Sequence, residues 1–206
     1  MNLKYSLSGQ LLVASSAVIN PFYTRGVCLV VHQDDKTTAG VMLNRPMRPD
    51  PEALQKLLGV KQGSDEDASD PVPAIAFDSN GLESSWSNLH FGGPLAGPVV
   101  AVHQDQQLAD TETAAGVYVS AQRENLEQVI QTSQSDYRLI VGHLQWQSEQ
   151  VFREIDAGVW HQIPAFAEVV FSDAQDMWPN VIRRATSNSL ARWLDVPDMM
   201  HAGAYN

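Results

Sequence analysis

Hydrophobic residues along this chain fall mostly into short runs separated by turn residues, a pattern typical of β-strands. The clearest run is Val27 to His32 (VCLVVH), whose apolar and β-branched side chains predict a buried strand. Ala39 to Leu43 predicts its partner, and the two form a hairpin with a loop of about six residues. Further strands are expected at residues 11–13, 72–77, 99–103, 117–119, 137–144 and 167–171.

Apolar residues three and four positions apart predict helices in other parts of the chain. Asp50-Pro51-Glu52 is a typical helix start, and we expect that helix to end at Gly59. Ser120 is expected to cap a second helix, and a third is expected at 148–157. A last helix begins the C-terminal helical tail at about 176–206.

The order of these elements favours the α+β class. Strands outnumber helices and partly follow one another directly, which is typical of a mainly antiparallel sheet rather than of regular βαβ alternation. The chain has 206 residues and no internal repeat, so we expect a single domain over 1–206. Its most acidic segment, at about 61–71, is expected to be a solvated loop.

Charge changes the range of expected partners. The 24 acidic and 13 basic residues give a net charge of −11, which repels nucleic-acid phosphates and anionic lipid. The densest basic group is Arg183, Arg184 and Arg192, too few for a DNA-binding surface. Direct nucleic-acid binding is therefore not expected.

The remaining composition predicts a soluble cytoplasmic protein. The first residues lack the apolar core of a signal peptide, and no stretch approaches the roughly 20 apolar residues of a membrane span. The one cysteine, Cys28, lies inside the run VCLVV and excludes an intramolecular disulfide. Burial there predicts an inert thiol.

Four blocks of the sequence carry a family resemblance. They are 9–15 (GQLLVAS), 40–46 (GVMLNRP), 91–94 (FGGP) and 142–160, where the recurring residues are Gly142, Trp146, Gln150, Glu154, Ile155 and Trp160. In composition and order these blocks resemble the YqgE/AlgH family of bacterial proteins. The resemblance implies an α+β fold built on a bent or barrel-like antiparallel sheet surrounded by helices, in a bacterial cytosol. It implies no known reaction.

The chain departs from the family pattern in the fourth block. His143 stands where the family usually has tyrosine, and Gln145 and Gln147 replace small residues beside Trp146. This turn is therefore predicted to be bulkier and more polar than usual. Some members of the family carry the label of transcriptional regulator, although the family has no recognisable DNA-binding module.

The candidate ligand-binding residues lie at predicted turns, where binding groups usually gather. They are Asn44, Arg45, Gly92, Gly93, Pro94, Trp146 and Gln150. Each also has a purely structural interpretation. Arg45 either clamps an anion or makes an ion pair, and the two glycines either present N–H groups or form a tight turn. Trp146 either packs the 148–157 helix against the sheet or lines a pocket.

Metal binding is a weaker possibility. His32, His103 and His143 lie near strand ends, and three converging histidines with an open position make a zinc site. No close spacing such as HExxH supports it, so hydrogen bonding at strand ends is the preferred interpretation. Glu154 is expected to pair with an arginine or to cap backbone groups.

Three functions follow in order of preference. The first is a non-enzymatic binding or regulatory module that acts through a protein or small-molecule partner. The second is a metal-assisted hydrolase that uses the strand-end histidines, and the last is direct DNA binding. We predict no catalytic residue, no cofactor and no membrane partner.

Overall fold

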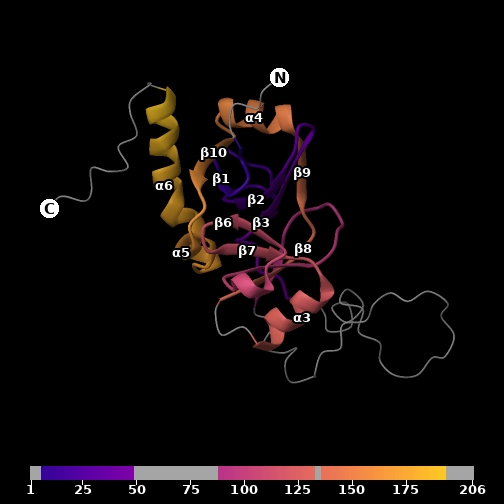
Figure 1. Ribbon diagram of the computed structural model, residues 1–206. Helices are drawn as coiled ribbons and strands as arrows, with labels where there is room; N and C mark the ends of the chain where they lie inside the picture. Colours follow the sequence, from indigo (N-terminus) through magenta and orange to yellow (C-terminus); the bar gives the residue numbers. More distant parts are fainter. Residues whose placement is uncertain (1–5, 49–87, 133–135, 194–206) are drawn as a thin grey trace.

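The computed structural model of the chain describes residues 6–48, 88–132 and 136–193 (Figure 1). The helix predicted from Asp50, the acidic loop at 61–71 and the strand at 72–77 lie outside these residues. The described residues contain ten strands and four α-helices, so the α+β class is confirmed.

Five strands form a first, wholly antiparallel sheet. Their order is β10 (Trp160–Pro164), β1 (Gln10–Ala14), β2 (Val27–Gln33), β3 (Thr37–Met42) and β9 (Leu144–Gln147). Side chains of β1 alternate between the two faces: Leu11 and Val13 join one core cluster, and Leu12 and Ala14 join another. Both faces of this sheet are therefore buried, which explains its nearly continuous apolar runs.

Five further strands form a second sheet. Their order is β4 (Leu89–Phe91), β8 (Arg138–Val141), β5 (Val100–His103), β7 (Val117–Ser120) and β6 (Thr111–Ala114). Only β4 and β8 pair in parallel. The predicted antiparallel sheet is thus divided into two sheets, and they do not close into a barrel.

The helices cover the sheets in layers (Figure 1). The inner faces of both sheets share one apolar core, which α5 (Ala167–Val170) and α6 (Ala174–Trp193) enter through Val170 and Met177. Helix α4 (Ser148–Asp156) covers the outer face of the first sheet. Helix α3 (Arg123–Thr132) covers the outer face of the second, and a short 3-10 turn (Gln106–Leu108) packs beside it.

The single strand predicted at 137–144 is wrong. The chain ends β8 at Val141 in the second sheet and begins β9 at Leu144 in the first. Gly142 makes the break with a φ of 77°, in the left-handed region that glycine adopts without strain. The crossing segment is therefore what carries Trp146 to the first sheet.

Glycines allow two backbone segments to touch where the chain crosses from the second sheet to the first. A β-carbon on Gly142 would lie 2.3 Å from the carbonyl oxygen of Gly93, and one on Gly92 would lie 2.2 Å from that of Gly142. The Gly92 N–H donates to Val141 O, while Gly92 O accepts from Met42 N. The Gly92-Gly93 turn thus joins the two sheets through backbone packing.

Three other predictions need correction. Residues 167–171 were predicted as a strand but form a helical turn, in which the N–H groups of Val169 and Val170 both donate to Phe166 O. A short apolar run is compatible with either a strand or a helix. The hairpin loop has three residues, 34–36, rather than about six. Ser120 is buried at the end of β7, and α3 begins only at Arg123.

Three strands, β4, β6 and β10, are additions to the prediction, and all three are edge strands. The strand β6 (TETA) exposes polar side chains, and β10 (WHQIP) ends in proline, so neither has the apolar pattern of a central strand. Within the described ranges, no helix combines the length and apolarity that crossing a membrane requires.

A buried arginine fixes α5 to the second sheet. Arg138 donates from Nε to Val170 O at 2.8 Å, from Nη2 to Ser172 O, and from Nη1 to His90 Nε2 at 2.7 Å. His90 Nδ1 lies 2.9 Å from Asn88 O, so it carries the ring proton and leaves Nε2 as the acceptor. The neutral form of His90 is the one this network requires.

His90 should make the fold sensitive to mild acid. Burial first, and the charge of Arg138 second, lower the pKa of His90 from 6.5 to about 4. Between these values the unfolded chain binds a proton that the folded chain does not, so stability is full above pH 6.5 and falls toward pH 4. The expected loss is on the order of 3 kcal/mol at about 1.4 kcal/mol per pH unit.

Urea unfolding across this pH window measures the effect. The variant His90→Gln keeps a polar side chain without a titrating ring, so its free energy of unfolding should vary less steeply with pH. Parallel curves for the two proteins would contradict the assignment.

Candidate functional site

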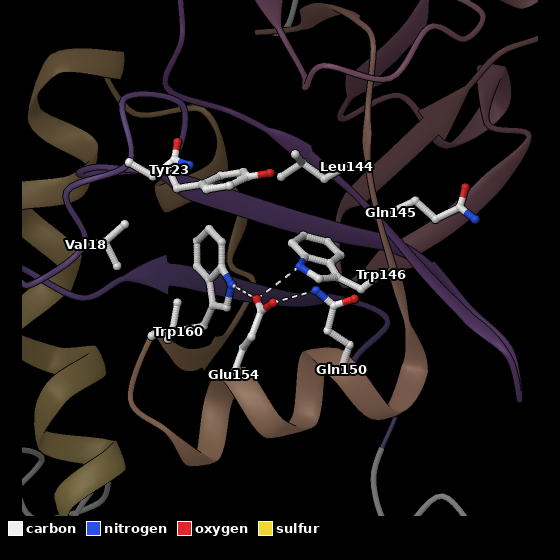
Figure 2. Close-up of a pocket in the computed structure, with 10 residues that line it drawn as sticks. Val18, Tyr23, Leu144, Gln145, Trp146, Gln150, Glu154 and Trp160 are labelled. Carbon is white, nitrogen blue, oxygen red and sulfur yellow. Dashed lines mark hydrogen bonds between the residues drawn. The ribbon is translucent and has the colours of Figure 1, made fainter.

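An open hollow of about 320 Å³ lies beside helix α4 (Figure 2). Val18, Asn20 and Tyr23 line it from the loop between β1 and β2, and Leu144, Gln145 and Trp146 from β9. Gln150 and Glu154 contribute from α4, Trp160 from the start of β10, and Val159 from the residue before it. Its volume is at the lower end for small-molecule pockets.

Glu154 lies at the centre of a hydrogen-bond network in this hollow. Its Oε2 accepts from the indole N–H of Trp160 at 2.9 Å and from that of Trp146 at 3.2 Å. Its Oε1 accepts from the Gln150 amide at 2.8 Å, four residues earlier on the same helix face. The carboxylate is therefore held by three neutral side-chain donors, not by the arginine or the backbone groups that we expected.

The aromatic rings that line the hollow pack against one another at steep interplanar angles. Trp146 and Trp160 meet edge to face, with centroids 6.0 Å apart and an interplanar angle of 89°. Tyr23 meets Trp160 at 5.9 Å and 71°, and Figure 2 shows its ring on the side of the indoles opposite Glu154. Such geometry is favourable for aromatic pairs and fixes the indole orientations.

The two tryptophans come from opposite edges of the first sheet. Trp160 belongs to β10 and Trp146 to β9, with three strands between them. In a flat sheet these edges would lie about 19 Å apart, too far for the indoles to touch. The sheet is therefore bent over α4, and the bend brings the site together.

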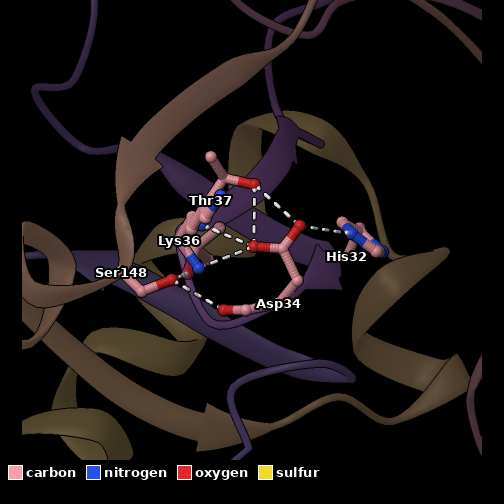
Figure 3. Close-up of polar contacts among 6 residues, drawn as sticks. His32, Asp34, Lys36, Thr37 and Ser148 are labelled. Atoms are coloured by element: carbon pink, nitrogen blue, oxygen red, sulfur yellow. Dashed lines mark hydrogen bonds and ion pairs between the residues drawn. The ribbon is translucent and has the colours of Figure 1, made fainter.

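The start of α4 is fixed to the β2–β3 hairpin (Figure 3). Ser148 donates from its hydroxyl to Asp34 O and from its N–H to Lys36 O, each at 2.9 Å. The Asp34 carboxylate accepts from the N–H groups of Thr37 and Lys36, which lower the pKa of Asp34 to about 2. This ordered turn sets the position of the helix that carries Glu154.

Asn44 and Arg45 hold the loop that lines the hollow but do not line it themselves. Asn44 accepts from Val27 N at 2.9 Å and donates to Arg25 O at 2.8 Å, and Arg45 donates to Thr24 O at 2.6 Å. Half burial lowers the pKa of Arg45, and its described partners are backbone carbonyls. Their described contacts therefore hold the end of the loop between β1 and β2 in place.

Gly92, Gly93 and Pro94 also lie away from the hollow. The glycines are buried in the crossing of the two sheets, and Pro94 is exposed beyond it. Of the predicted binding residues, the structure thus brings Trp146 and Gln150 into one site. Glu154 and Trp160 complete it, and their signal in the sequence was the four-residue spacing from Gln150 and the second tryptophan.

The three candidate metal-binding histidines lie in separate surroundings. His32 is exposed 3.5 Å from the Asp34 carboxylate, and the His143 ring faces Gly97. His103 is fully buried. Within the described residues, no group of three or more histidine, cysteine, aspartate or glutamate side chains is placed to hold a metal.

His103 does contact a serine, but with the wrong proton position for catalysis. Its Nδ1 accepts from Asp105 N, so Nε2 carries the proton and donates to Ser120 Oγ at 2.8 Å. The Ser120 hydroxyl in turn donates to Leu108 O. A general base would need to accept the serine proton, and both residues are fully buried, so this pair is structural.

Comparison with known proteins identifies the family. The AlgH-like family model matches residues 11–189, so the chain belongs to this family. A UPF0301 protein from Thermobifida fusca is 29% identical over 196 residues, which cover 88% of each chain. One from Chlorobaculum tepidum is 28% identical over 182 residues, covering 85% of this chain and 84% of the relative.

Two solved structures share the fold. A crystal structure from Corynebacterium diphtheriae has a TM-score of 0.62 at 22% identity, covering 89% of this chain and 90% of that one. The solution structure of AlgH from Pseudomonas aeruginosa has a TM-score of 0.62 at 16% identity, covering 98% of each. The resemblance seen in the four sequence blocks is thereby confirmed.

Proposed function

We propose that this AlgH-like protein is a non-enzymatic, cytoplasmic binding module that takes a small molecule in the hollow beside α4. The observation that carries the proposal is the Glu154 carboxylate, held by Trp146, Trp160 and Gln150 in an open, aromatic-lined cavity. Pockets of mainly apolar lining with a few fixed polar groups are the usual form of ligand sites.

The lining favours binding over catalysis. Among the described residues that line it, the titratable side chains are those of Glu154 and Tyr23, and none is a serine, cysteine, histidine or lysine. Each oxygen of Glu154 already accepts a hydrogen bond, and the described lining places no serine or cysteine nucleophile beside it to be activated. These features support recognition of a ligand rather than its conversion.

Any regulatory role would act through a further protein. The net charge of −11 disfavours a nucleic-acid surface, and ligand binding at α4 would instead alter the loop and helix exposed around the hollow. Ile19 in that loop is 92% exposed and Phe22 is 54% exposed, which suits a partner surface next to the ligand.

The test is a fragment screen by heteronuclear NMR that observes the tryptophan indole N–H signals. We expect binding fragments to shift the Trp146 and Trp160 signals, because both groups face the hollow, and to leave Trp178 unshifted, because it donates to Ala14 O elsewhere. The Trp146→Phe variant assigns one of the two signals.

A blocking variant and a matched control complete the test. Gln150→Phe fills the cavity from α4, whereas Arg153→Phe places the same ring on the same helix outside it. Affinity for the fragments should fall at least about tenfold in the first variant and stay unchanged in the second. A screen with no fragment at this site would overturn the proposed function.

A further inference from the structure

The loop between β1 and β2 presents two large apolar side chains to solvent. Ile19 is 92% exposed and Phe22 is 54% exposed, and neither belongs to the lining of the hollow. The Phe22 ring also lies against Phe91 of β4, with centroids 6.4 Å apart. A single exposed apolar side chain is ordinary on a protein surface, whereas several gathered in one place mark a contact surface.

This loop is held in one conformation by its own hydrogen bonds. The N–H of Phe22 donates to the Asn20 side chain at 2.9 Å. The N–H groups of Tyr23 and Thr24 both donate to Asn20 O, at 3.0 and 2.8 Å. Arg25 follows with a φ of 53°, a left-handed conformation that residues other than glycine rarely adopt. Because the loop is already ordered, its exposed side chains are preorganised for contact with a partner.

The segments that build this surface carry positive charge only. They are residues 15–26, 43–48 and 88–95. Arg45 joins them, because it donates from Nη2 to Thr24 O and accepts at its carbonyl oxygen from the Phe91 N–H. The three segments contain Arg25, Arg45 and Arg48 and none of the 24 acidic residues of the chain. This surface therefore differs in charge from the acidic chain as a whole.

These arginines have no acidic partner among the described residues, since no described ion pair includes one of them. Arg45 donates to Asn44 O at 3.1 Å and to Thr24 O at 2.6 Å, which uses two of the five N–H groups of its guanidinium. The Arg25 guanidinium lies over the Trp178 ring, 5.6 Å from its centroid. Two positioned cations thus lie in or beside the loop that exposes the apolar side chains.

Charge and apolarity together restrict the partner. A guanidinium binds a carboxylate with two parallel hydrogen bonds, and arginine and aromatic residues are enriched in protein interfaces. Charges beyond a Debye length of about 8 Å are screened, so the local arginines decide which charge is accepted at contact. An anionic membrane fits less well, because its wide surface would also face the net charge of −11.

We infer that the loop surface, formed by Ile19, Phe22, Arg25 and Arg45, docks a short acidic segment of another protein. The apolar side chains of that segment would cover Ile19 and Phe22, and its carboxylates would pair with the two arginines. The inference goes beyond the proposed ligand site and does not require a ligand in the hollow.

Selection from a library of short random peptides tests this inference on the full chain. The library is first depleted on the variant Ile19→Ser and then selected on the unaltered protein. We expect the enriched peptides to contain more acidic than basic residues, together with an aromatic or branched aliphatic residue. No enrichment after the depletion step, or enrichment of neutral or basic peptides, would overturn the inference.

Fluorescence anisotropy with an enriched peptide then separates apolar contact from charge. Ile19→Ser alters a side chain that is almost fully exposed, so the fold should be kept while affinity falls about tenfold. Arg25→Gln removes one cation and should also lower affinity by about threefold to tenfold. Leu190→Ser on α6 and Arg153→Gln on α4 are the matched controls, and both should bind as the unaltered protein does. Unchanged affinity in Ile19→Ser or in Arg25→Gln contradicts the docking surface.

Two further measurements distinguish other occupants of the loop surface. Cosedimentation with vesicles of phosphatidylserine and phosphatidylcholine that Ile19→Ser abolishes would assign the surface to a membrane. A dimer in sedimentation velocity that the same variant dissociates would assign it to a second copy of the chain. Either result overturns the inference. The fragment screen reports on the hollow separately, so a failed peptide selection and a failed fragment screen are distinguishable.

Discussion

Replacing Gly142 with alanine should lower the free energy of unfolding by about 2–5 kcal/mol. The substitution has two separate costs. Holding a non-glycine residue at a φ of 77° costs about 1–2 kcal/mol. The new β-carbon would also lie 2.3 Å from the Gly93 carbonyl oxygen, and forcing apart two backbone segments adds about 1–3 kcal/mol.

Gly116 provides a matched control for the first cost. Its φ is 70°, and a β-carbon there would meet nothing within 4 Å. Gly116→Ala should therefore lose only the conformational part, about 1–2 kcal/mol. Urea unfolding of both variants measures the difference, and equal losses would show that the contact between the Gly92-Gly93 turn and Gly142 does not stabilise the fold.

The Gly142 substitution should also affect the candidate site. Gly142 determines where the chain leaves the second sheet, and Trp146 follows it by four residues on β9. A shifted crossing would move the Trp146 indole away from Glu154. We therefore expect a changed near-ultraviolet circular dichroism signal in Gly142→Ala even where the protein remains folded, and an unchanged one in Gly116→Ala.

The local sequence pattern was sufficient to predict those strands and helices whose side-chain burial follows one simple pattern along the element. The strand at Val27 to His32 was recognisable because its first four residues are buried on both faces, so apolar residues follow one another. The α4 helix was recognisable from Val151, Phe152 and Ile155 at helical spacing. Each signal lies within a few adjacent residues.

The break at Gly142 could not be predicted from its neighbours. Tyr137 to Leu144 is as apolar as one continuous strand, and a lone glycine is compatible with a strand. The reason for the break lies about fifty residues earlier in the chain, where Gly92 and Gly93 provide the space for a backbone crossing. The determining contact is therefore non-local.

The candidate site was only partly predictable for the same reason. Trp146 and Gln150 were singled out, but Glu154 was expected to pair with an arginine or to cap backbone groups, the usual partners of a carboxylate. Its donors are instead two indoles brought together by the bend of a five-stranded sheet. Asn44 and Arg45 were predicted as candidate ligand-binding residues, and their described contacts are to the loop between β1 and β2 rather than to the hollow.

Replacing Arg138 with methionine should also lower the free energy of unfolding by about 4 kcal/mol. Methionine preserves much of the side-chain volume but donates no hydrogen bond. Val170 O, Ser172 O and His90 Nε2 would each lose their donor. A buried acceptor without a partner costs about 1–3 kcal/mol, and water entering the α5 end would recover part of that loss.

The expected loss is a large share of the roughly 5–15 kcal/mol that stabilise a typical domain. Arg153→Met is the control, because Arg153 is exposed and its ion pair with Glu149 is long, at 3.9 Å. This variant should change the free energy of unfolding by less than about 0.5 kcal/mol. Amide hydrogen exchange locates the effect: protection should fall first at Val169 and Val170 in α5. A loss below about 1 kcal/mol, or one spread evenly over both sheets, would mean that Arg138 does not fix α5 to the second sheet.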